Sequence, residues 1–336
     1  MPADNSWDPF LTVPEEITNP ENLYLTGNEY FSLPQIYPDG GIASLNILSF
    51  EKRGLLEFCG SPGSPLLTPR LVINGQIINL NDLLRWHYYL DWMPSFKADA
   101  PDYSWSLAGE INAPPGVKGF CYRLELVNTG REKITVQLGW QGSFGAFNYR
   151  IFSSRPAADR HRIDYNDWTK SLILEAAAGL PLAAVALAVE PVTDWIFEPE
   201  SEHFSTGSEM NLEPGEKTSS ILYGAVNLEA DGAGTTSVDL RRQGYANLKE
   251  SSAAWLENRH IAQEDDFLTS LLNRNLFFAY FYSLGRTLDG ERLVAVTSRS
   301  PRYYVSAAFW SRDSLLWSFP AVVLVDQKSA REMLLH

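Results

Sequence analysis

The chain has 336 residues, of which 45% are hydrophobic and 20% are charged, and its formal net charge at pH 7 is −14. This length and apolar content are enough to bury a sizeable core in one large or two ordinary domains. The strong negative charge argues against a nucleic-acid partner, because binding to a phosphate backbone needs clustered positive charge.

Targeting and redox signals are absent from the sequence pattern. The N-terminal residues Met-Pro-Ala-Asp-Asn-Ser-Trp-Asp contain neither a basic region nor an apolar run typical of a signal peptide. The longest apolar run, around 182–189, is far too short to span a bilayer. The two cysteines, Cys59 and Cys121, show no metal-binding or redox spacing, and we interpret both as buried free thiols. We therefore expect a soluble, cytoplasmic protein without a membrane partner.

From about residue 25 to about residue 250 the pattern is typical of β-structure. Two apolar runs flank Asn74-Gly75, a dipeptide that favours a type I′ hairpin turn, because both of its residues adopt positive φ readily. Alternating apolar residues over 120–126 and 134–140 predict two strands that pair as an antiparallel hairpin around 128–130. Together with later apolar runs, these strands predict a large antiparallel β-sandwich.

Near residue 245 the pattern changes from strands to helices. Residues 248–259 contain no turn-forming residue and predict a linker helix. Residues 266–284 predict a second helix, and Gly285 is expected to end it. The apolar face expected for this helix is broad and consists of Phe267, Leu268, Leu271, Leu272, Leu276, Phe278, Ala279 and Tyr282. A face of this width is typical of the interior of a helical assembly.

Two shorter helices are predicted at the end of the chain. The first begins near 311–314 and runs to about Val325. Pro320 should kink this helix or leave a gap in its hydrogen bonds, because proline has no amide hydrogen. Asp326 is expected to cap the N-terminus of the second helix, which carries the apolar residues Ala330 and Met333.

An Arg-Asp pair stands between aromatic residues at the start of the first of these helices. Residues 309–317 read Phe-Trp-Ser-Arg-Asp-Ser-Leu-Leu-Trp. A carboxylate accepts hydrogen bonds from two hydroxyl groups and a guanidinium donates in a fixed fork, so the pair suits the recognition of sugar hydroxyl groups. The structural alternative is that Asp313, Ser311 or Ser314 caps the helix and that Arg312 is its ion-pair partner.

The order of an all-β region, a linker helix and paired helices bearing Trp-x-Arg-Asp-Ser is similar to that of a known family. The chain resembles glycoside hydrolases with an N-terminal β-supersandwich and a C-terminal (α/α)6 six-hairpin barrel, including glucoamylase-like and glycogen-debranching-like proteins. The match is strongest over 298–334, and Gly-Phe-Cys-Tyr-Arg-Leu-Glu-Leu-Val-Asn at 119–128 also looks like a strand of such sandwiches.

This resemblance implies a β plus α multidomain fold. We expect a β-sandwich domain at 1–245, a linker helix at 246–262 and the first helices of a truncated (α/α)6 glycosidase domain at 263–336.

The resemblance also implies a sugar-binding role for the motif. Arg312 and Asp313 would bind the hydroxyl groups of the terminal, non-reducing sugar at the mouth of the barrel. Trp310 would form a neighbouring wall, and Tyr303 and Tyr304 would line the same mouth. The implied partner is a carbohydrate, either an oligosaccharide or an α-glucan, and we expect neither a cofactor nor a metal site.

The residues that cut a glycosidic bond are not expected in this chain. Hydrolysis normally needs two carboxyl groups, which an inverting enzyme holds about 6.5–9.5 Å apart. In the resembled family they come from later barrel segments, whereas only 70 residues follow Asp266, enough for two helices and part of a third. No catalytic role is assigned to the carboxylates of the turns and charged clusters, which are Glu264, Asp265, Asp289 and Glu291.

We therefore expect the N-terminal part of an exo-acting, inverting, glucoamylase-like glycoside hydrolase that acts on α-glucosides or oligosaccharides. The chain alone would be inactive and would self-associate through the exposed faces of its last helices. One alternative is a non-catalytic carbohydrate-binding or scaffold protein, and another keeps the enzyme class but changes the sugar to mannose or trehalose. The aromatic cluster at 86–92 is expected to pack in the core or at a domain interface.

Overall fold

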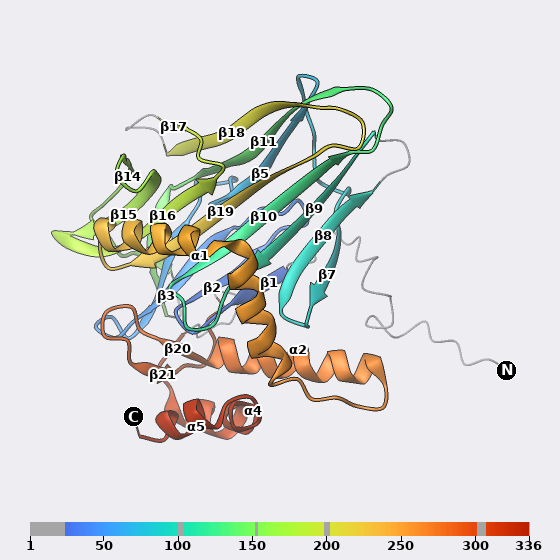
Figure 1. Cartoon of the computed structure of the whole chain (residues 1–336). Coiled ribbons are helices and arrows are strands. Elements are labelled where there is room, and N and C mark those ends of the chain that lie inside the picture. Colours follow the sequence, from blue (N-terminus) through green and yellow to red (C-terminus); the bar gives the residue numbers. More distant parts are fainter. Residues whose placement is uncertain (1–23, 100–103, 152–153, 198–201, 301–306, 336) are drawn as a thin grey trace.

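The computed structural model describes residues 24–99, 104–151, 154–197, 202–300 and 307–335. Within these ranges the chain forms a large antiparallel β-sandwich followed by helices, as the sequence predicts (Figure 1). One long helix runs along the face of the sandwich and then turns away from it, and the remaining helices lie beneath the sandwich in this view.

Three sheets build the sandwich, and the strands in each pair antiparallel. The first sheet has six strands in the order β1 (Tyr24–Gly27), β2 (Phe31–Ile36), β3 (Ser44–Ser49), β4 (Gly54–Cys59), β12 (Ala146–Arg150) and β13 (Ser154–Pro156). The second has eight, in the order β14 (Arg160–Asn166), β15 (Ser171–Ala178), β16 (Leu180–Glu190), β19 (Lys217–Asn227), β10 (Gly119–Asn128), β9 (Trp105–Asn112), β8 (Met93–Asp99) and β7 (Arg85–Tyr89). The third has five, in the order β17 (Trp195–Phe197), β18 (His203–Leu212), β11 (Ile134–Ser143), β5 (Thr68–Ile73) and β6 (Gln76–Ile77).

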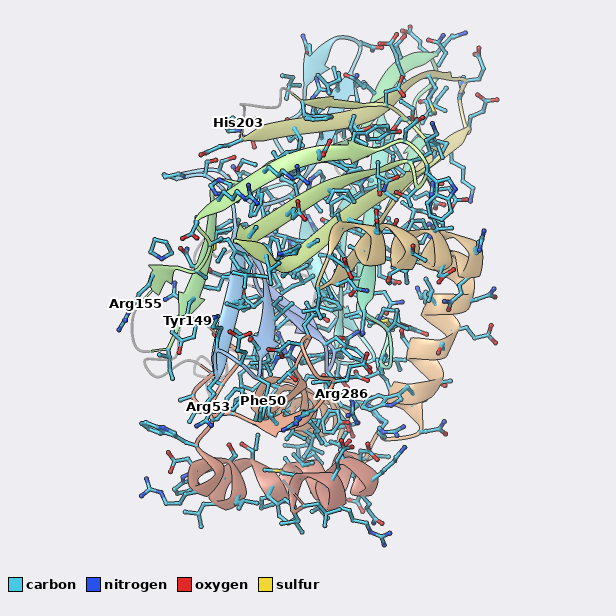
Figure 2. All side chains as sticks on the ribbon, turned by 90° about the vertical axis from the view of Figure 1, so that its left-hand side faces the viewer. Phe50, Arg53, Tyr149, Arg155, His203 and Arg286 are labelled. Carbon is cyan, nitrogen blue, oxygen red and sulfur yellow. The ribbon has the colours of Figure 1, made fainter. Side chains whose placement is uncertain are left out.

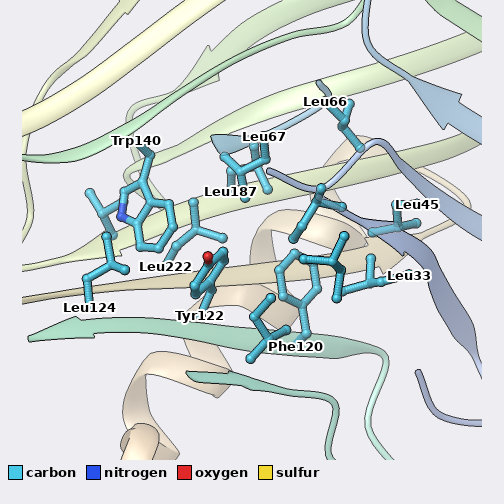
Figure 3. Close-up of a cluster of buried hydrophobic side chains, with 14 of the residues drawn as sticks. Leu33, Leu45, Leu66, Leu67, Phe120, Tyr122, Leu124, Trp140, Leu187 and Leu222 are labelled. Carbon is cyan, nitrogen blue, oxygen red and sulfur yellow. The ribbon is translucent and has the colours of Figure 1, made fainter. Parts of the chain in front are cut away.

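The core of the sandwich contains apolar side chains from all three sheets (Figure 3). The rings of Tyr122 and Trp140 meet at its centre, with 4.6 Å between their centroids. The polar atoms of both side chains have hydrogen-bond partners. The Tyr122 hydroxyl donates to Gly40 O (3.0 Å), and Trp140 Nε1 donates to Ser220 Oγ (3.0 Å). Buried Tyr and Trp side chains normally need such partners.

The predicted pairing of 120–126 with 134–140 is wrong. β10 pairs with β9 and β19, whereas β11 pairs with β5 and β18, so the turn after β10 carries the chain from one sheet to another. The predicted alternation is present, but the two apolar faces meet across the core. Period-two alternation indicates only that one face of each strand is buried. Both the predicted hairpin and the observed placement of the strands in two facing sheets meet this condition. The Asn74-Gly75 turn is confirmed, with φ values of 51° and 80° and Ile73 opposite Gln76.

The first helix, α1 (Ala230–Glu257), begins well before the predicted residue 248, inside the segment that the pattern assigned to strands. Gly244 interrupts it with φ 76° and ψ 152°. Before this kink, Ala233, Ser237 and Leu240 are buried at a spacing of four and three residues, which places them on one helical face. Packing on the eight-stranded sheet therefore overcomes the low helix propensity of the glycines in this segment.

The second helix, α2 (Asp266–Ser283), has its N-terminus capped by Asp265, whose carboxylate accepts from Leu268 N (2.9 Å). Its buried face differs from the predicted one and consists of Asn273, Leu276, Phe277, Tyr280, Phe281, Tyr282 and Ser283, whereas Phe278 is exposed. Gly285 does not end the helix, because it lies within the strand β20 (Leu284–Arg286). A Cβ at Gly285 would lie 2.6 Å from Leu48 Cδ1, so close packing explains this glycine.

The predicted helix after residue 311 consists of α3 (Ser311–Asp313), the π-helix η1 (Ser314–Ser318) and α4 (Phe319–Val325). The predicted disturbance at Pro320 is confirmed, because the π-helical turn stands directly before it and Phe319 N donates to Ser314 O. The cap at Asp326 is also confirmed. Its carboxylate accepts from Lys328 N (3.2 Å) at the start of α5 (Gln327–Met333).

A hairpin of β20 and β21 (Leu293–Ala295) joins the helices to the first sheet of the sandwich. Leu288 N donates to Leu48 O (2.8 Å), and Asp289 accepts hydrogen bonds from the turn after β3. On the other side of the hairpin, Arg286 forms a bidentate pair with Glu332 of α5 at 2.9 and 2.8 Å. Phe50, Arg53 and Arg286 lie at this junction in Figure 2.

Candidate functional site

Residues 296–297 hold the segment that contains the Arg-Asp pair. Thr297 N donates to Ala308 O (3.0 Å), just before the motif. Ser314 Oγ, just after the pair, donates to Val296 O (3.0 Å). Val296 is buried against β3 and β4 of the first sheet. The backbone is therefore anchored on both sides of the Arg-Asp pair.

Arg312 and Asp313 are adjacent and bonded to each other. Arg312 Nε donates to Asp313 Oδ1 (3.1 Å), and the side chain of Arg312 is 82% exposed while that of Asp313 is 28% exposed. Asp313 makes no capping hydrogen bond to the helix that follows. The pair thus presents donors and an acceptor to solvent from a fixed helical start, which suits the binding of neighbouring hydroxyl groups.

Two exposed tryptophans accompany the pair. Trp310 is 40% exposed and Trp317 is 79% exposed. Aromatic rings combine a large apolar face with a polar tip, so they suit a surface that receives an amphipathic ligand. The sequence identifies Trp310 as a site residue, whereas it does not single out Trp317, although both stand in the same aromatic stretch. Tyr303 and Tyr304 lie outside the described residues.

The carboxylates to which no catalytic role was assigned are held in the junction or on the surface. Asp289 accepts from Ser49 Oγ (2.7 Å), Phe50 N (2.7 Å) and Glu51 N (2.9 Å). Asp265 caps α2, and Glu291 pairs with Lys118 at 2.5 Å.

These contacts lower the pKa of both junction carboxyls. Burial opposes the lowering of the Asp289 pKa, but the donors from Glu51, Phe50 and Ser49 outweigh it. The hydrogen bond and charge of Lys118 lower the pKa of Glu291. Both carboxyls are therefore ionised at neutral pH, and neither can act there as a general acid.

The aromatic cluster at 86–92 packs as the sequence predicts. Trp86 stacks on Tyr24 in the sandwich core, with 4.3 Å between ring centroids. Trp92 stacks on Phe281 of α2, with 5.0 Å between centroids, and its Nε1 donates to Gly27 O (2.8 Å). The contacts of Trp92 join the sandwich to the helices.

Neither a metal site nor a membrane span is found in the described parts of the chain. Among these residues, no group of three or more His, Cys, Asp or Glu side chains is placed to hold a metal ion. None of the helices in the described ranges is long and apolar enough to cross a bilayer.

No protein-family model matches the sequence, and no curated protein matches it. Solved structures do match. A candidate kojibiose phosphorylase from the human microbiome aligns with 96% of this chain, with a TM-score of 0.65 and 11% sequence identity. A bacterial glucoamylase, solved in complex with acarbose, aligns with 95% of this chain, with a TM-score of 0.50 and 10% identity.

The likeness to these two structures concerns the fold. It confirms a β-sandwich followed by the beginning of a helical domain, which is the predicted fold class. The chain spans about half the length of each structure, because the alignments cover 47% and 52% of those chains.

Proposed function

We propose that this chain is the N-terminal part of an exo-acting, glucoamylase-like glycoside hydrolase that inverts the anomeric centre of α-glucosides or oligosaccharides. The observation that carries the proposal is the shared architecture over 95% of the chain with a glucoamylase that binds acarbose. The exposed Arg312–Asp313 pair supports it, because its donors and acceptor match sugar hydroxyl groups.

Each side chain of the proposed site has a different role in sugar binding. Asp313 accepts hydrogen bonds from two hydroxyl groups of the terminal sugar, and Arg312 donates from the guanidinium nitrogens that Asp313 does not engage. Trp310 and the exposed Trp317 offer aromatic faces to the apolar face of the sugar ring. We propose that Tyr303 and Tyr304, which lie outside the described residues, belong to the same sugar site. This constellation holds a sugar but contains no acid or base for cleavage.

A second candidate reaction is phosphorolysis of an α-linked disaccharide. It is favoured by the TM-score of 0.65 to the candidate kojibiose phosphorylase. The two reactions differ in whether phosphate or water receives the glycosyl group, so the phosphate dependence of sugar release by a protein containing the further helical domain distinguishes them. Sugar binding without either reaction in that longer protein would favour the non-catalytic carbohydrate-binding alternative.

Calorimetric titration of the 336-residue chain with acarbose or maltotriose tests the sugar site. Asp313→Asn should weaken binding about 10–100-fold, because a hydrogen bond to a charged group contributes about 1.5–3 kcal/mol. Asp167→Asn, in the exposed turn between β14 and β15, is the matched control and should leave affinity unchanged. Equal affinities of wild type and Asp313→Asn would refute the sugar-binding role. Sustained hydrolysis of an α-glucoside by this chain would refute its proposed inactivity.

The proposal also includes self-association of the chain and a cytoplasmic location. Leu316 and Leu324 are exposed apolar side chains of η1 and α4, and their burial between two copies would drive self-association. Sedimentation velocity should show oligomers that Leu316→Asp dissociates, whereas a monomer at all concentrations would contradict this. The free thiols Cys59 and Cys121 are consistent with a reducing, cytoplasmic location.

A further inference from the structure

Arg299 is a fully buried arginine at the junction of the sandwich and the helices. Its Nη1 donates to the backbone oxygens of Asn28, Phe281 (3.0 Å) and Leu284 (3.4 Å). All three are uncharged carbonyls, and two belong to the end of α2, where the helix dipole supplies a partial negative charge. The carboxyl of Glu29 interacts with the Arg299 charge, but the hydrogen bonds of the guanidinium to the described residues go to these backbone oxygens.

The other side of this guanidinium has no hydrogen-bond partner. In the described part of the chain, Arg299 Nε and Nη2 are buried and unbonded, and so are Oδ1 and Nδ2 of Asn46 and the hydroxyl of Ser44. Each buried polar group without a partner costs about 1–3 kcal/mol, and a charged one costs more. Five such atoms on neighbouring elements indicate a bound species that satisfies them.

We infer the position of Asn46 relative to Arg299 from the strand register. Asn46 of β3 is paired with Ser32 of β2, and Ser32 Oγ donates to Arg299 O (3.3 Å). Leu48 is two residues further along β3, on the same face of the sheet as Asn46. A Cβ at Gly285 would meet both Leu48 Cδ1 (2.6 Å) and Arg299 Cζ (3.2 Å), so Leu48 also lies next to the guanidinium. Asn46 is therefore a neighbour of two residues near Arg299, Ser32 at its backbone oxygen and Leu48 near its guanidinium.

We propose that a small monovalent anion, such as chloride, binds between Arg299 and Asn46. The Nε and Nη2 hydrogens of Arg299 form the fork that anions bind, and Asn46 Nδ2 and Ser44 Oγ add neutral donors. Ordered water would satisfy the hydrogen bonds, whereas an anion would also offset the charge of the guanidinium at its unbonded edge, which Glu29 offsets only from a distance because no hydrogen bond joins the two.

The charge of Arg299 at neutral pH is consistent with this site. Burial lowers the pKa of Arg299 to about 10, so the guanidinium remains charged at neutral pH. The carboxyl of Glu29 accepts from Gly116 N (2.7 Å) and not from Arg299. Burial raises the pKa of Glu29, whereas the charges of Arg286 and Arg299 lower it.

Thermal unfolding of the full chain in chloride, bromide and gluconate at constant ionic strength tests the site. The melting temperature should rise saturably with chloride or bromide, by roughly 2 °C at a tenfold excess over the dissociation constant. Crystals grown in bromide should show an anomalous peak beside Arg299 Nε and Nη2. A melting temperature that is the same in all three salts, or the absence of the peak, would leave Arg299 as a cap of α2 and overturn the proposal.

Asn46→Asp supplies an internal carboxylate in place of the bound anion. This variant should keep the stability that the wild type has in saturating chloride, and it should lose the dependence on chloride. Asn112→Asp is the matched control, because the side chain of Asn112 is also buried and unbonded. Asn112 is paired with Cys121 of β10, and this face of the eight-stranded sheet packs against α1 and not against Arg299. Asn112→Asp should be less stable than wild type and keep the chloride response. An unchanged chloride response in Asn46→Asp would overturn the proposed position of the site.

Discussion

Replacing Asp289 by asparagine should loosen the contact between the hairpin and the sandwich. The Asp289 carboxylate accepts three hydrogen bonds, from Ser49 Oγ (2.7 Å), Phe50 N (2.7 Å) and Glu51 N (2.9 Å). An asparagine removes the charge and turns one acceptor into a donor that faces another donor. Hydrogen bonds to charged groups contribute about 1.5–3 kcal/mol each, and this site is half-buried, so we expect a loss of about 2 kcal/mol at pH 7.

The pH dependence of this loss follows from the lowered pKa of Asp289. A carboxyl whose pKa is lower in the folded state stabilises the fold above its unfolded pKa of about 4, and this stabilisation disappears as the pH falls through the folded value. Asparagine does not titrate. The difference in unfolding free energy between wild type and Asp289→Asn should therefore be constant above about pH 5 and shrink towards pH 2–3.

Urea unfolding followed by tryptophan fluorescence measures this difference at each pH. Asp167→Asn serves as the control, because the Asp167–Lys170 pair is exposed and should contribute little to stability. The reasoning would be refuted if Asp289→Asn were no more destabilising than Asp167→Asn at pH 7. A difference that stays the same from pH 7 to pH 3 would contradict the role of the charge.

Three further changes test other parts of the structure. Gly285→Ala should destabilise the fold by about 1–3 kcal/mol in urea unfolding, because the new Cβ would lie 2.6 Å from Leu48 Cδ1. An unchanged free energy of unfolding would mean that the Leu48 side chain moves away freely. Asp326→Ala should cost at least about 1 kcal/mol, because it removes the cap on Lys328 N and the acceptor for Ser329 Oγ (2.7 Å), whereas Asp326→Ser should restore only the cap. Burial raises the pKa of Cys59 to about 12, so roughly one thiol in 10⁴ is ionised at pH 8, and labelling by iodoacetamide should be slow until urea unfolds the chain.

Local signals in the sequence predicted local structure well. The Asn74-Gly75 turn and the Asp326 cap depend on the backbone preferences of one or two residues, and both are present. The helix before Gly244 was missed, because Gly232 and Gly234 weaken its propensity and only packing on the sheet makes it favourable. A Cβ at Gly234 would lie 3.1 Å from Thr169, so the helix lies close to the sheet.

Long-range pairing could not be predicted from the sequence. Alternation identified β10 and β11 but did not reveal that they belong to different sheets. The exposed Arg312–Asp313 pair was found because it is contiguous. The cluster of Arg299 and Asn46 was not found, because it forms only when β3 and the end of α2 come together.

The contact between the first sheet and the hairpin also has consequences for biosynthesis. Ser49 and Asp289, which bond across the junction, are separated by 240 residues in the chain. At about 5–20 residues per second, roughly 12–50 s pass between the synthesis of the two partners. During that interval the sheet bearing the fully buried Asn46 lacks its cover from the hairpin and residues 294–300. The nascent sandwich is thus exposed to misassembly on the ribosome, and chaperones that protect uncovered sheets should raise its yield.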